Sequence, residues 1–101
     1  TGKAEIRPES KGQLAEMAQA LKADAQWRVA IVGHTDTEGT VEGNLRLSQA
    51  RAEAVVQALV REHGIAAARL DAKGVAAYAP VASNATPEGR ALNRRVEMVQ
   101  R

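Results

Sequence analysis

Arg51 and Asp36 are the residues whose charge and spacing first indicate a binding site. An apolar stripe at helical spacing predicts the buried face of a helix and consists of Leu47, Ala54, Val55, Ala58 and Leu59. Arg51 lies within this stripe, four residues after Leu47 and four before Val55. A guanidinium does not lose its charge, so burying it without a partner is costly. We therefore expect Arg51 to contact a carboxylate or an anionic ligand.

Asp36 is the acid that we expect to lie near Arg51. It follows an apolar strand predicted at residues 28–33 and precedes a helix predicted from about residue 44. Arg51 is about two turns into that helix, roughly 10 Å from its start. An aspartate and an arginine at such a crevice can hold a zwitterion, because the aspartate binds an ammonium and the arginine binds a carboxylate. This predicts a small amino acid or a peptide end as ligand. Alternatively, the Arg51 side chain extends to the rim of the core or forms a structural ion pair with a loop acid.

A catalytic or metal site has weaker support in the same segment. His34, Asp36 and Ser48 are the residue types of a Ser-His-Asp triad, yet Ser48 lies inside the predicted helix and no Gly-x-Ser-x-Gly turn surrounds it. We expect His34 to hydrogen-bond backbone groups in its loop. His34 and Asp36 also lack further metal ligands at a recognisable spacing. We therefore predict a protein without enzymatic activity, metal or cofactor.

The composition argues against a nucleic-acid partner. The chain of 101 residues has 14 basic and 12 acidic side chains, a net charge of +2 and no run of Lys or Arg. Arg94 and Arg95 follow Asn93 and could contact phosphate, but adjacent arginines at a strand start are more often solvated or paired. The absence of cysteine excludes disulfides and thiol chemistry. No apolar run approaches the roughly 20 residues of a membrane span.

Hydrophobic spacing and capping residues predict the elements that position these side chains. We expect helices at 10–23 and 44–63, strands at 28–33, 70–75 and 95–99, and a short helical turn that opens at Thr86-Pro87. Gly64 suits the left-handed end of the second helix. Together they predict one domain, residues 1–101, of the α+β class: a two-layer sandwich with helices on one face of a small mixed sheet. A sheet of three strands is small for two helices to pack on, so we expect a further strand before Thr1. We also expect a longer parent protein, which carries any membrane anchor.

The spacing of polar residues and glycines along nearly the whole chain resembles one family. Residues 31–36 read Ile-Val-Gly-His-Thr-Asp, followed by Gly39 and by Asn44-x-x-Leu47-Ser48-x-x-Arg51-Ala52. Further on come Gly64-Ile65, Arg69-Leu70, Gly74, Pro80, Asn84-x-Thr86 and Gly89-Arg90-Ala91-x-Asn93-Arg94-Arg95-Val96-Glu97. The set resembles the OmpA C-terminal-like domain, which outer-membrane porins, peptidoglycan-associated lipoproteins and flagellar stator proteins share.

The resemblance implies a βαβαββ fold and non-covalent binding of peptidoglycan in the periplasm of a Gram-negative bacterium, with the parent protein tethered to the outer membrane. The family's ligand is the meso-diaminopimelate of the stem peptide. By this match, Asp36 holds the ammonium of diaminopimelate and Arg51 holds its carboxylate. The match also implies supporting ligand-binding roles for four further residues: Thr35, Asn44, Leu47 and Arg94.

The chain departs from the family pattern at two places. The family's first strand would precede Thr1, and the ligand-contacting loop after that strand would be residues 1–3. Residues 74–78 lack the family's usual second glycine and acid, so we expect a differently shaped loop there. A second function stays open, namely a protein–protein assembly module or homodimer of an envelope complex, for which Val56 and Val60 would offer an exposed helix face. The sequence does not distinguish a porin, a lipoprotein or a stator as the parent.

Overall fold

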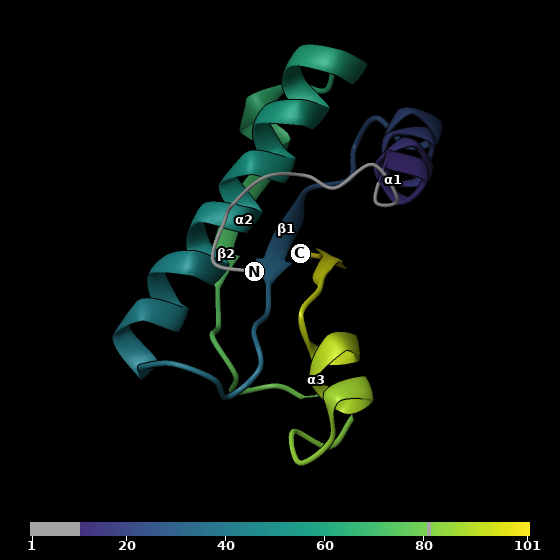
Figure 1. Cartoon of the computed structure of the whole chain (residues 1–101). Helices are drawn as coiled ribbons and strands as arrows, with labels where there is room; N and C mark the ends of the chain where they lie inside the picture. Colours follow the sequence, from purple (N-terminus) through teal and green to yellow (C-terminus); the bar gives the residue numbers. More distant parts are fainter. Residues whose placement is uncertain (1–10, 81) are drawn as a thin grey trace.

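The computed structural model describes residues 11–80 and 82–101, and Figure 1 shows how their elements are arranged. In chain order these are α1 (Lys11–Ala23), β1 (Val29–Gly33), α2 (Val41–His63), the 3₁₀ turn η2 (Ala67–Arg69), β2 (Leu70–Gly74), α3 (Pro87–Asn93) and β3 (Val96–Gln100). The helices and strands expected from hydrophobic spacing are all present within this part of the chain. The strand expected before Thr1 and the loop at residues 1–3 lie outside the described residues.

The strands form one mixed sheet in the order β2-β1-β3. β1 pairs in parallel with β2 and antiparallel with β3. α2 covers β1 and β2 and packs against α1, so the core lies between the helices and the sheet. Its most deeply buried apolar side chains include Leu14, Leu21, Val29, Ile31 and Leu59. The predicted α+β architecture is confirmed. No helix in the described ranges is long and apolar enough to cross a membrane.

α2 begins at Val41, three residues before the start predicted at residue 44. Thr40 is its N-cap, because the Thr40 hydroxyl accepts a hydrogen bond of 2.9 Å from the Gly43 N–H. Asn44 therefore lies at the first turn of α2 and not ahead of the helix. At the other end, Gly64 has a φ of 70°, which confirms the predicted left-handed C-cap.

The predicted turn at Thr86-Pro87 is a complete short helix, α3. The Thr86 hydroxyl accepts a hydrogen bond of 3.0 Å from the Gly89 N–H, and Pro87 takes the first helical position. α3 ends at Asn93, immediately before the arginines that lead into β3. The chain therefore reaches β3 through a capped helix rather than a loose turn.

Two paired glycines let α2 lie directly on the sheet. Gly33 of β1 and Gly74 of β2 are partners in the parallel register. A Cβ atom on Gly33 would lie 2.1 Å from the Ser48 carbonyl oxygen, and one on Gly74 would lie 2.3 Å from the Gln49 backbone nitrogen. The Gln49 side chain donates to the Ala72 carbonyl at 3.0 Å and accepts from the Gly74 N–H at 2.8 Å. These contacts fix α2 over the carboxyl ends of β1 and β2.

The buried face of α2 differs by about one residue from the predicted stripe. Its buried residues are Ser48, Ala52, Val55, Ala58 and Leu59. Leu47, Arg51 and Ala54 are only partly buried. The cause is the close contact of Gly33 and Gly74 with α2, which buries Ser48. The hydrophobic pattern had predicted burial of Leu47 instead. Arg51 therefore lies at the edge of the buried face and not in its middle.

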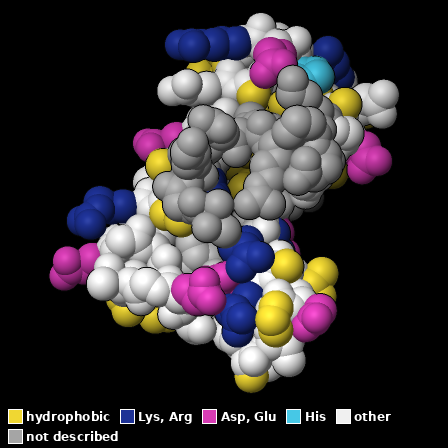
Figure 2. Space-filling view, in the orientation of Figure 1, with side chains coloured by type: hydrophobic (Ala, Val, Ile, Leu, Met, Phe, Trp, Pro, Cys, Tyr) yellow, Lys and Arg dark blue, Asp and Glu magenta, His cyan; other side chains and the backbone are white. Residues whose placement is uncertain are grey.

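The surface differs from the expected one in a second respect. Val56 and Val60, which were predicted to form an exposed face of α2, pack partly buried against the core, so that prediction is wrong. On the face shown in Figure 2, basic and acidic side chains are interspersed over the described surface and form no single basic patch. This distribution agrees with the small net charge of +2.

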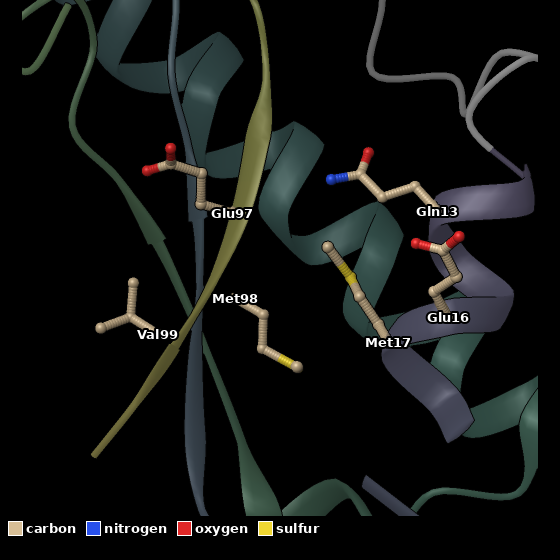
Figure 3. A pocket seen from close by; sticks show the side chains of 6 residues that line it. All are labelled: Gln13, Glu16, Met17, Glu97, Met98 and Val99. Carbon is tan, nitrogen blue, oxygen red and sulfur yellow. The ribbon is translucent and has the colours of Figure 1, made fainter. Parts of the chain in front are cut away.

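A groove separates α1 from β3. It is lined by Gln13, Glu16, Met17, Glu97, Met98 and Val99 (Figure 3). Met98 points toward α1, whereas Glu97 and Val99 project from the other face of β3 (Figure 3). Gln13 donates from Nε2 to the Val96 carbonyl at 3.1 Å and so links the two elements. None of the ligand-binding residues predicted from the sequence lines this groove.

Candidate functional site

The loop at residues 34–40, here called the site loop, leaves the carboxyl end of β1 and begins buried. His34, Thr35 and Asp36 expose 3%, 3% and 5% of their surfaces. The His34 N–H donates to the Arg95 carbonyl and the Thr35 N–H donates to the Ala76 carbonyl, both at 2.8 Å. The start of the site loop is thus held between the residue that precedes β3 and the residue that follows β2 by two positions.

Ala76 supports this frame in a strained conformation. It has a φ of 50°, in the left-handed region, within residues 74–78, where we expected an unusual loop shape. Such a conformation costs an alanine roughly 1–2 kcal/mol. The Ala76 N–H donates to the buried Ser48 hydroxyl at 3.1 Å, and its carbonyl accepts from Thr35, so both backbone groups are satisfied. The chain therefore keeps a backbone shape that glycine favours without having glycine there.

The Asp36 carboxylate is the charged centre of the site. Its Oδ1 accepts a hydrogen bond of 2.9 Å from the Glu38 N–H, and its Oδ2 pairs with Nη1 of Arg94. Burial alone would raise the pKa of Asp36, but the Glu38 N–H and the Arg94 guanidinium, with Arg90 farther off, together lower it below the ordinary value. Asp36 is therefore an anion at neutral pH, and only 7% of its side chain is exposed.

Asn44 ties the site loop to the first turn of α2. Its Nδ2 donates to the carbonyls of Asp36 at 3.2 Å and Glu38 at 2.9 Å. Asn44, which the family resemblance marked as a supporting position, thus contacts the backbone carbonyl of Asp36. Its described role is to hold the backbone on both sides of Thr37.

Among the predicted residues, Arg94 is the one whose charge contacts Asp36. Arg94 is the C-cap of α3 and exposes 24% of its side chain. Leu47 and Arg51 lie partly exposed on α2, one and two turns after Asn44. The sequence argument placed Arg51 in the core as the natural partner of Asp36. The structure instead supplies Arg94 as the ionic partner and places Arg51 at the helix edge, about 10 Å along α2 from Asn44.

Thr35, which precedes Asp36 in the site loop, contributes a buried hydroxyl. Its Oγ1 has no hydrogen-bond partner, although the residue is almost fully buried. A buried polar atom without a partner is uncommon and costly. Thr35 is therefore positioned by its backbone, and its hydroxyl keeps its full hydrogen-bonding capacity.

His34 faces β3 rather than the loop backbone, so the prediction for its side chain is wrong. Its Nε2 lies 3.0 Å from Oε1 of Glu97, without hydrogen-bond geometry, and its Nδ1 has no partner. Burial is the main reason why the pKa of His34 is lowered; Arg95 adds to this effect, and Glu97 opposes it. His34 is therefore neutral at neutral pH, and it packs the site loop against the start of β3.

The arrangement does not form a catalytic triad or a metal centre. The Ser48 hydroxyl donates to the Leu45 carbonyl at 3.0 Å and accepts from Ala76, so it is committed to the backbone. Among residues 11–80 and 82–101, no group of three or more His, Cys, Asp or Glu side chains is placed to hold a metal ion. Fixed charges of both signs around a small loop suit the binding of a charged ligand.

Two further ionic contacts lie at the site, and the sequence identified the acidic partner in neither of them. Arg90 Nε lies 3.3 Å from Glu38 Oε1. Arg95 pairs with Glu97 at 2.9 Å and donates to the Ala79 carbonyl at 2.8 Å, which holds the segment after β2. Of the two alternatives left open for Arg94 and Arg95, solvated or paired, the structure shows the paired one. The four-residue spacing of Arg90 and Arg94 opposite the two acids of the site loop was the available signal.

A comparison with protein families supports the resemblance read from the sequence. The model described as "OmpA family" matches residues 1–94. Among solved structures, the peptidoglycan-associated lipoprotein from Burkholderia pseudomallei superposes with a TM-score of 0.88 at 35% identity, covering 98% of this chain and 83% of that one.

Similar sequences occur in several envelope proteins. Outer membrane protein Omp38 of Acinetobacter baumannii is 44% identical over 96 residues, which are 95% of this chain and 27% of Omp38. The peptidoglycan-binding protein ArfA of Mycobacterium bovis is 46% identical over 86 residues, 85% of this chain and 26% of ArfA. The chain thus spans about a quarter of the length of these relatives.

Proposed function

Because this chain belongs to the OmpA family, we propose that it binds peptidoglycan non-covalently and anchors an envelope protein to the cell wall. The observation that carries the proposal is the buried, ionised Asp36, which the Glu38 N–H and Arg94 hold at the carboxyl end of β1. A carboxylate held in this way is ready to bind an ammonium group. The names of two relatives, a peptidoglycan-binding protein and a peptidoglycan-associated lipoprotein, support the same reading.

The proposed ligand is the meso-diaminopimelate of the stem peptide. Its free end carries an ammonium and a carboxylate on one carbon, so it needs partners of both charges. We assign the ammonium to Asp36 and the carboxylate to Arg51, which projects from the same helix as Asn44. A planar guanidinium binds a carboxylate through two parallel hydrogen bonds, which fixes the orientation of the ligand.

The supporting residues have distinct proposed roles. Asn44 and Arg94 hold the loop and the carboxylate in place. The Thr35 hydroxyl, which has no partner in the described structure, offers a hydrogen bond. Leu47, one turn before Arg51, offers apolar contact to the aliphatic chain of the ligand. We propose binding without turnover, with no metal or cofactor.

The proposed location is the periplasm, with the parent protein tethered to the outer membrane. The related Omp38 is named as an outer membrane protein, and the structural neighbour from Burkholderia is named as a lipoprotein. This chain would then be the part that meets the wall. The membrane attachment would come from other segments of the parent.

Calorimetric titration with meso-diaminopimelate, together with cosedimentation with purified sacculi, tests the proposal. The unmodified chain should bind both. Asp36→Asn and Arg51→Gln should each weaken binding at least about 30-fold, since loss of one partner of a desolvated charge pair costs about 2 kcal/mol or more. Glu53→Gln, an exposed change on α2, is the matched control and should bind normally.

Ligand analogues make the test independent of variant folding. Diaminopimelate that is acetylated on the amine, or amidated on the carboxylate of the same carbon, should lose most of its affinity for the unmodified chain. Binding of both analogues at the original affinity would contradict the two-charge assignment. Release of peptidoglycan fragments on incubation with sacculi would instead indicate a hydrolase.

The alternative function, an assembly module or homodimer, was assigned to an exposed face of α2 that the structure does not show. Val56 and Val60 pack against the core and do not form an exposed face. Light scattering over a range of concentrations would show whether a dimer forms through some other surface. A strict monomer that still cosediments with sacculi would leave peptidoglycan anchoring as the function.

A further inference from the structure

A second ionic contact runs beside the Asp36–Arg94 pair. Arg90 Nε lies 3.3 Å from Glu38 Oε1, with side-chain exposures of 24% and 69%. Asp36 and Glu38 are two residues apart in the site loop, whereas Arg90 and Arg94 are four residues apart and lie on one side of a helix. The two acids of the site loop therefore meet two arginines presented by α3 and its C-cap.

Glu38 joins the Arg90 side chain to the backbone that holds the Asp36 carboxylate. Its backbone N–H donates to Oδ1 of Asp36 at 2.9 Å. Its backbone carbonyl accepts from Asn44 at 2.9 Å. Its side chain is paired with Arg90. A movement of Glu38 would thus disturb both the hydrogen bond to the charged oxygen and the contact with α2.

Hydrogen bonds and close backbone packing hold Arg90 and α3 in place. Arg90 Nη1 donates to the Asn84 carbonyl at 3.1 Å, while Nδ2 of the fully buried Asn93 donates to the Asn84 side chain at 2.8 Å. A Cβ atom on Gly89 would lie 1.8 Å from the Ser83 carbonyl oxygen, so α3 packs directly on the segment before it. The Arg90 guanidinium is therefore anchored at one side and free to hold Glu38 at the other.

We infer that Arg90 is a positioning residue for the proposed ligand, acting through Glu38 to hold the Asp36 carboxylate in its binding orientation. This inference rests on the proposed function, since Asp36 is the group that binds the ammonium. An exposed ion pair contributes little to global stability. Loss of the Arg90–Glu38 pair should therefore change the position of the site loop and the affinity for the ligand. It should change the melting temperature much less.

Calorimetric titration of the folded chain with meso-diaminopimelate, at low and at high ionic strength, tests the inference. Arg90→Gln and Glu38→Gln should each weaken binding about twofold to fivefold at low salt. The double variant should lose no more than Arg90→Gln alone, because that change already removes the contact with Glu38. Arg90→Lys should recover part of the affinity. Arg61→Gln, an exposed change at the far end of α2, is the matched control.

Amide hydrogen exchange gives a readout that does not depend on ligand. In Arg90→Gln, the Glu38 N–H should exchange several-fold faster, while the amides of β1 keep their protection. Additive losses in the double variant, or unchanged affinity and unchanged Glu38 exchange in the single variants, would overturn the inference. If the unmodified chain itself fails to bind diaminopimelate, the proposed function has failed, and the Glu38 exchange rate still decides whether Arg90 holds the loop.

Discussion

Gly33 of β1 lies directly beneath the Ser48 carbonyl of α2, so close that an added methyl group would have its carbon 2.1 Å from that oxygen. The contact is between backbone atoms, which cannot rotate away as a flexible side chain can. The separation between α2 and the sheet is therefore set by the absence of a side chain. Because Asn44, Leu47 and Arg51 all project from α2, the same contact sets their height above the site loop.

Gly33→Ala should lower the free energy of unfolding by about 3 kcal/mol, because overfilling a packed contact forces the backbone to shift. Urea unfolding followed by circular dichroism measures this loss. Gly12→Ala is the matched control: nothing lies within 4 Å of a Cβ atom built there, and alanine is the better helix former. It should stabilise the chain by up to about 1 kcal/mol. Equal stability of the two variants would contradict the contact.

Asp36 should give the folded chain an acid-dependent stability. Its pKa is lowered on folding, so its contribution is fully present above the ordinary value of 3.8 and is lost as the pH falls through the lower folded-state pKa. Carboxyl-carbon NMR titration should place the Asp36 pKa below 3.8 in the unmodified chain. In Arg94→Gln it should move back toward that value. No movement would mean that Arg94 does not hold the carboxylate.

His34 should make the fold less stable in mild acid. Its pKa lies below 6.5 in the folded chain, so the unfolded chain binds the proton first as the pH falls. Stability should therefore decline from about pH 7 downward, until the folded-state pKa is passed. Melting temperatures between pH 7.5 and pH 5 should show a smaller decline in His34→Gln than in the unmodified chain. His63→Gln serves as control, and an equal effect of both changes would refute the assignment.

Arg69 should contribute more to stability than its place in a short 3₁₀ turn suggests. Its guanidinium donates to the carbonyls of Leu21, Asp24 and Trp27, and so joins the end of α1 to the start of β2. Arg69→Met should cost about 2–3 kcal/mol of unfolding free energy, because three carbonyls lose a charged donor. Arg61→Met, on an exposed position of α2, should change stability by less than about 0.5 kcal/mol.

The parts of the fold that depend on local pattern were accessible from the sequence. The spacing of Leu14, Met17 and Leu21 predicted α1, and the Gly64 and Thr86 caps marked one end of α2 and the start of α3. The start of α2 was less accessible, because Gly43 weakens the helical pattern there and the Thr40 cap precedes it. These signals are carried by residues a few positions apart, which is the range that propensity and capping cover.

The parts that depend on tertiary contact were not accessible in this way. Hydrophobic spacing placed Arg51 in the core. The true buried face differs because Gly33 and Gly74 let α2 approach the sheet at Ser48, a contact that helical spacing does not reveal. Arg94 and Asp36 are 58 residues apart, so no local rule connects them. The family resemblance identified Arg94 as a supporting residue. Its contact with Asp36 became visible only in the structure. Glu38 and Arg90 needed the structure, since their pairing depends on how α3 is placed beside the site loop.

The Gln49 side chain has a consequence for association between molecules. A primary amide carries the same donor and acceptor as a peptide group, and Gln49 offers both to Ala72 and Gly74 at the outer side of β2. It therefore takes the place that a neighbouring strand would take. An exposed strand edge invites pairing with another chain and, from there, aggregation. A strand added at Ala72 and Gly74 would therefore first have to displace the Gln49 amide, which disfavours growth of the sheet at these two residues.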